Sequence, residues 1–193
     1  SADQVTLNGG EIDIQNGTLT INTNRANANT TTGGNITIEK GVFGNSDESL
    51  VLDAHSAGTG AISLGIVGAS TSQIAGITAT AEGGITLNGD ITTSDAGTGI
   101  TFNDEVIIAD SASITIKSNG AANDAGTDGD ITFVGTISGS GADSTELGNA
   151  ENLTIDSGRG DVSIASVGLT EAKRLNNLTV NSGTGGTAAA DMD

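Results

Sequence analysis

The sequence predicts an all-β protein built as a parallel β-solenoid, in which short strands pair with the strands of the preceding and following repeats. A three-residue phrase of apolar residue, Thr or Ser, and apolar residue recurs from end to end, mostly beside Gly, Asp or Asn. The 193 residues include 30 Gly and three Phe, with no Pro, Cys, Trp or Tyr. Near-copies of one strand and one bend are typical of a stacked architecture. We therefore expect a thin aliphatic interior rather than a globular core.

The copies of the phrase place the strands along the chain. The two apolar side chains of each copy are expected to point inward and the hydroxyl outward, because successive residues of a strand face opposite sides. Gly and Asp before a strand provide the geometry of a bend, and Asn-Gly pairs are too few for hairpins throughout. The predicted strands are VTL at 5–7, LTI at 19–21, ITI at 36–38, ISL at 62–64, ITL at 85–87, ITF at 100–102, ITI at 114–116, ITF at 131–133, LTI at 153–155, VSI at 162–164 and LTV at 178–180.

Longer copies define the repeating unit. ESLVLDAHSAGTGAISLGIVG at 48–68 aligns with ENLTIDSGRGDVSIASVG at 151–168. Segments 141–152 and 168–177 break the pattern and are expected to be loop excursions, the second with helix-forming residues. We expect residues 1–193 to form one elongated domain, as part of a longer protein or as a filament subunit. Equivalent first strands are predicted at Leu19, Leu50, Ile77, Ile114, Leu153 and Leu178.

The charge excludes some classes of partner. The net charge is −18, from 24 Asp and Glu against 6 Lys and Arg. Nucleic acids and anionic membrane surfaces require a basic footprint, so neither is expected as a partner. Membrane insertion is not expected either, because no stretch approaches the roughly 20 apolar residues of a spanning helix. The chain starts at Ser1 without a signal peptide, which favours a processed or excised piece of something longer.

Several phrases resemble a known family. GDITFVGTISGSG, NLTIDSGRGDVSIASVG and LNNLTVNSGTGG are similar to the repeats of large bacterial surface proteins of the filamentous-haemagglutinin type, including β-strand-repeat exoproteins and autotransporter passengers. The resemblance covers most of residues 5–182. It implies a right-handed parallel β-helix, secreted to the bacterial cell surface, that acts as a stalk, adhesin or matrix fibre. Its partners would be adjoining repeats and a host or neighbouring cell surface.

An enzymatic role is not expected. The chain has one histidine, His55, and no Cys, although acidic neighbours at Asp47-Glu48, Asp104-Glu105 and Asp128/Asp130 have the chemistry for cleaving a glycosidic bond. Sugar-cleaving clefts usually present aromatic faces, and this chain has no Trp or Tyr. The alternative to a structural protein is therefore a glycan-binding or glycan-cleaving β-helix module, which a groove of clustered acids would favour.

Calcium is the one cofactor that the motifs suggest. Asn123, Asp124, Asp128 and Asp130 lie within NDAGTDGD, a single Gly-containing loop. Calcium takes six to eight oxygen ligands from carboxylates, amides and carbonyls. The loop has neither EF-hand spacing nor a closing Glu, and a polar turn that uses Asp and Asn for its geometry is the alternative interpretation.

Two further surface patterns have simple explanations in the repeat. Arg159-Gly160-Asp161 matches the cell-attachment tripeptide, but Gly160-Asp161-Val162 occupies the same repeat position as Gly129-Asp130-Ile131. Outward Thr residues could align as a stripe on one face, although β-propensity and solubility also explain them. These residues include Thr37, Thr86, Thr115, Thr132, Thr154 and Thr179.

The two ends of the solenoid are predicted to be assembly sites. Val5 and Leu7 at the start, and Leu178 and Val180 at the finish, belong to ordinary copies of the phrase rather than to polar caps. An uncapped end presents unpaired backbone groups together with apolar side chains. We therefore expect end-to-end continuation, either with adjoining repeats or between identical chains that form a fibre.

Overall fold

The computed structural model describes residues 4–23, 34–55, 59–94, 98–119, 128–141, 151–168, 170 and 173–182. Within these residues the protein is all-β, and the paired strands run parallel, as predicted. Among the described residues, no helix has the length and apolar character needed to cross a membrane.

Each predicted copy of the phrase that was named above lies within a strand. The repeat itself therefore locates these strands correctly. The strands are β1 (Val5–Leu7), β2 (Ile12–Asp13), β3 (Thr18–Asn22), β4 (Ile36–Ile38), β5 (Val42–Phe43), β6 (Ser49–Asp53), β7 (Ile62–Leu64), β8 (Gly76–Thr80), β9 (Ile85–Leu87), β10 (Ile91–Thr92), β11 (Gly99–Phe102), β12 (Val106–Ile108), β13 (Ser113–Lys117), β14 (Ile131–Gly139), β15 (Asn152–Gly158), β16 (Val162–Val167) and β17 (Asn177–Ser182).

The strands fall into three parallel ladders, which the chain visits in turn. Ladder A contains β1, β4, β7, β9, β12 and the C-terminal parts of β14 and β16. Ladder B contains β2, β5, the bridging residue Val67, β10, β13, β15 and β17. Ladder C contains β3, β6, β8, β11 and the N-terminal parts of β14 and β16. One pass through ladders A, B and C is called a rung below.

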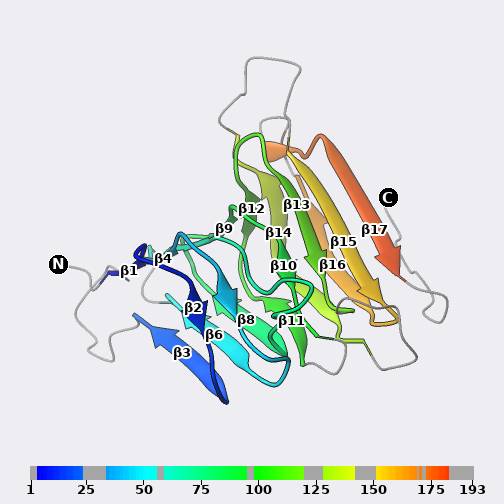
Figure 1. The fold of residues 1–193 in the computed structure, drawn as a ribbon. Helices are drawn as coiled ribbons and strands as arrows, with labels where there is room; N and C mark the ends of the chain where they lie inside the picture. The colour runs from blue at the N-terminus through cyan, green and yellow to red at the C-terminus, as the bar shows by residue number, and fades with distance from the viewer. Residues whose placement is uncertain are drawn as a thin grey trace.

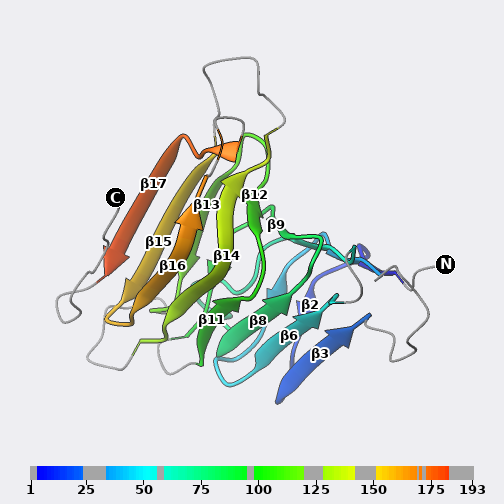
Figure 2. The ribbon, with the colours of Figure 1, turned by 180° about the vertical axis from the view of Figure 1, so that it is seen from behind.

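The ladders form one large curled sheet and two smaller sheets. Ladders A and C belong to one 11-stranded sheet, because the long strand β14 runs from ladder C into ladder A. In ladder B, β10, β13, β15 and β17 form a 4-stranded sheet, and β2 and β5 form a 2-stranded one. Both ribbon views show β3, β6, β8 and β11 side by side, and β13, β15 and β17 side by side (Figures 1 and 2).

The core consists of aliphatic columns between the ladders. Ile36 pairs with Ile62, which pairs with Ile85, and all three side chains are at most 1% exposed. The Thr between two such residues is more exposed than they are, which confirms the predicted alternation. Burial of each aliphatic side chain stabilises the fold by about 1.5 to 3 kcal/mol. The column in ladder C includes a stacked aromatic pair, Phe102 and Phe133, with ring centroids 5.3 Å apart.

The predicted alignment of the repeats is partly wrong. Strands β3, β6 and β8 stack in ladder C, and β13, β15 and β17 stack in ladder B, as predicted for each trio. However, Ile77 pairs with Ile100 in ladder C. Ile114 lies in ladder B, where it pairs with Leu153. Segment 48–68 therefore begins in ladder C with β6, whereas segment 151–168 begins in ladder B with β15. The phrase has the same form in each ladder, so sequence similarity did not distinguish them.

The outward hydroxyls do not form one stripe. Thr37 and Thr86 lie in ladder A, and Thr132 lies in ladder C. Thr115, Thr154 and Thr179 do stack in register, but in ladder B. Residues 142–150 of the first predicted excursion, and 169, 171 and 172 of the second, lie outside the described residues. The predicted helical turn at 168–177 therefore stays a prediction.

Candidate functional site

The corners of the rungs place side-chain oxygens against the backbone of neighbouring rungs. Asn35 Oδ1 accepts a hydrogen bond from the Ala61 backbone N at 3.0 Å, and Asp104 Oδ2 accepts one from Ala81 N at 2.7 Å. At each of these corners the side chain accepts a hydrogen bond from a backbone N–H group that lies just outside a strand. A buried or half-buried N–H without a partner is costly, so these acceptors stabilise the bend.

The described part of the predicted calcium loop has the same arrangement. Asp128 Oδ2 accepts a hydrogen bond from the backbone N of Arg159 at 2.5 Å. Asp130 Oδ1 accepts one from the backbone N of Asp161 at 2.9 Å. Both acceptors come directly before β14, and both donors lie in the bend between β15 and β16. These two carboxylates therefore fasten one rung to the next.

The other two calcium candidates, Asn123 and Asp124, lie outside the described residues. Among the residues that the structure describes, no three His, Asp or Glu side chains gather into a group suited to a metal ion. The calcium site therefore stays a prediction.

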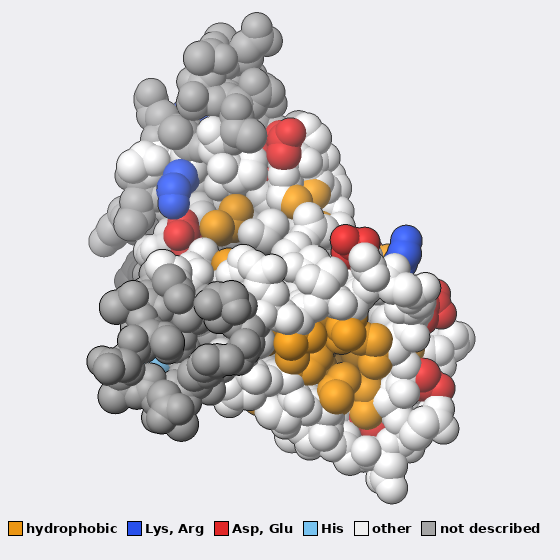
Figure 3. All heavy atoms as spheres, turned by 90° about the vertical axis from the view of Figure 1, so that its left-hand side faces the viewer, with side chains coloured by type: hydrophobic (Ala, Val, Ile, Leu, Met, Phe, Trp, Pro, Cys, Tyr) orange, Lys and Arg blue, Asp and Glu red, His pale blue; other side chains and the backbone are white. Residues whose placement is uncertain are grey.

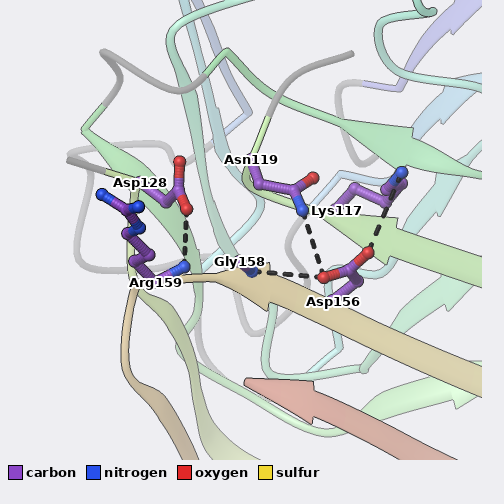
Figure 4. A network of polar contacts seen from close by, with 6 residues as sticks. All are labelled: Lys117, Asn119, Asp128, Asp156, Gly158 and Arg159. Atoms are coloured by element: carbon purple, nitrogen blue, oxygen red, sulfur yellow. Dashed lines mark hydrogen bonds and ion pairs between the residues drawn. The ribbon is translucent and has the colours of Figure 1, made fainter. Parts of the chain in front are cut away.

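A third carboxylate at this corner, that of Asp156, organises the end of β15. Asp156 Oδ1 accepts hydrogen bonds from Asn119 Nδ2 at 3.1 Å and from the backbone N of Gly158 at 3.2 Å. Asp156 Oδ2 lies 3.8 Å from Lys117 Nζ. Figure 4 shows these contacts beside the Asp128–Arg159 contact. Gly158 has a φ of 58°, and a Cβ there would overlap the Asp128 carboxylate, so the corner requires glycine.

The cell-attachment tripeptide lies at this corner. Ile131 pairs with Val162, so Asp161 follows Asp130 by one rung, which confirms the predicted repeat position. A Cβ at Gly160 would overlap the Gly129 carbonyl oxygen, which places these two glycines in direct contact. The Arg159 and Asp161 side chains are exposed, while their backbone N–H groups bond to the preceding rung. The stacking of the repeat thus accounts for the glycine and the aspartate.

The acidic neighbours Asp104-Glu105 also connect rungs. Glu105 Oε1 accepts hydrogen bonds from Lys173 Nζ at 2.8 Å and from Ser138 Oγ at 2.7 Å. The bond from Lys173 is the main cause that holds the pKa of Glu105 below its ordinary value of 4.5, and Ser138 adds to it against partial burial. The charged form stabilises the fold above that pH, and the contribution is lost as the pH falls through the lowered pKa. It is small, because the side chains of Lys173 and Glu105 are 49% and 36% exposed.

The remaining candidates have structural partners as well. Glu48 is 4% exposed, and its Oε2 accepts a hydrogen bond from the backbone N of Asn45 at 2.6 Å. The exposed His55 lies 3.3 Å from Glu82 Oε1, and its backbone N donates to Asp53 Oδ1 at 3.0 Å. These contacts hold the ends of β6 and the bends beside it. Glu48 therefore has a structural role in the bend before β6.

The predicted assembly residues lie on edge strands. Val5 and Leu7 are in β1, and Leu178 and Val180 are in β17. The first three are partly exposed, and Val180 is 41% exposed. The partly exposed Ile12 of β2, and Leu19 and Ile21 of β3, were not among the predicted assembly residues. The phrase at 19–21 was a sufficient signal, because it belongs to the same first rung.

Comparisons with family models, with curated proteins and with solved structures found no match to this chain. The likeness to surface proteins of the filamentous-haemagglutinin type therefore stays a prediction based on the repeated phrases.

Proposed function

We propose that the chain is a right-handed parallel β-helix that acts as a structural and adhesive element outside a bacterial cell, as a stalk or fibre. The observation that carries this proposal is the continuity of the ladders. Each ladder repeats the same kind of inward residue from rung to rung, as Ile36, Ile62 and Ile85 do in ladder A. A right-handed path is the expected one, because parallel crossovers are right-handed in about 98% of cases.

The mechanism of such an element is mechanical. Backbone pairing along each ladder gives stiffness, and the aliphatic columns give cohesion. The corner acids fasten successive rungs, as Asp130 does for Asp161. The net charge of −18 favours solubility and discourages side-by-side clumping of molecules. Bends between strands are then the places where a host or neighbouring cell surface would be recognised.

The proposal predicts that one whole rung can be removed without loss of the fold. Deleting residues 62–84 takes out β7, Val67 and β8, one strand or bridge from each ladder. Ladder A then continues from Ile36 to Ile85, ladder B from Val42 to Ile91, and ladder C from β6 to β11. A solenoid is held by contacts between nearest neighbours, so we expect a folded chain of lower stability. Circular dichroism and urea denaturation measure this outcome.

The control deletion removes residues 62–75, which takes β7 from ladder A and the bridge at Val67 from ladder B but leaves β8 in ladder C. This variant should unfold, because the chain then passes from β6 to β8 within ladder C without a strand in ladder A or ladder B between them. Equal loss of structure in both deletions would contradict the stacked-rung fold. Beads that carry the wild-type chain should adhere to cell layers. Failure of the wild-type beads to adhere would contradict the adhesive part of the proposal alone.

A further inference from the structure

We draw no further inference here: the strongest candidate, the surface patch of partly exposed apolar side chains that Leu7, Ile12 and Leu19 form on the edge strands β1, β2 and β3 at the N-terminal end of the stack (Figure 3), is an unpartnered apolar face, and nothing in the structure shows what covers it.

Discussion

Replacing Phe102 by alanine is expected to lower the free energy of unfolding by about 3 to 5 kcal/mol, the usual cost of removing a buried aromatic ring. Phe102 is fully buried in β11 and stacks on Phe133 of the next rung, with an interplanar angle of 29°. Loss of the ring leaves a cavity in the column of ladder C. The backbones on both sides cannot close it easily, because β11 pairs in parallel with β8 and β14. Urea denaturation followed by circular dichroism measures the change.

The matched control for this substitution is Phe43→Ala. Phe43 lies in β5 and is partly exposed, so its removal should cost clearly less. Both variants lose the same atoms, and the difference between them reports burial within the columns. Equal losses at the two positions would contradict the buried aromatic pair.

Replacing Gly68 by alanine is expected to cost about 2 to 5 kcal/mol. Gly68 follows the ladder B bridge at Val67 and has a φ of 67°. A side chain in the left-handed region costs about 1 to 2 kcal/mol. A Cβ there would also overlap the carbonyl oxygen of Thr92 in the next rung, and overpacking against fixed structure adds about 1 to 3 kcal/mol. The midpoint of urea denaturation is the measurement.

Gly17→Ala separates the two contributions. Gly17 has a φ of 73°, but nothing lies within 4 Å of a Cβ added there. The free energy of unfolding of Gly17→Ala should therefore fall only by the cost of the unfavourable backbone conformation. If Gly17→Ala and Gly68→Ala destabilise the chain equally, adjacent rungs do not approach each other at Gly68 as described.

The strands were predictable from the sequence because each one carries its own short pattern of inward and outward residues. Each Ile-Thr-Ile type phrase alternates inward and outward residues, and the structure follows this pattern from Ile36 in β4 to Ile164 in β16. Which strands lie over one another was less predictable. Ile77 and Ile114 have the same local sequence character, yet they lie in ladders C and B, because bends of different length separate the strands. Only the pairing of whole rungs resolves this choice.

The candidate site was harder to predict for a related reason. Asp128 and Asp130 have the sequence context of a polar cation-binding loop, and their hydrogen-bond donors, Arg159 and Asp161, belong to the following rung. The Lys173 partner of Glu105 lies even farther along the chain. Such partners become visible only when the length of each rung is known. The partly exposed apolar residues of β2 and β3 were missed because only the strand pairing shows that β1, β2 and β3 belong to one rung.

The most direct test of the stacked rungs is a comparison of two engineered disulfides in this cysteine-free chain. Thr78 pairs in register with Thr101 in the neighbouring strand of ladder C, whereas the sequence alignment places the copy at Thr115 next. Adjacent strands lie about 4.8 Å apart, within the range that a disulfide bridges. We predict that Thr78→Cys with Thr101→Cys forms an intramolecular disulfide under mild oxidation, and that Thr78→Cys with Thr115→Cys does not, as peptide mapping would show. A disulfide in the second pair and none in the first would contradict the ladder assignment.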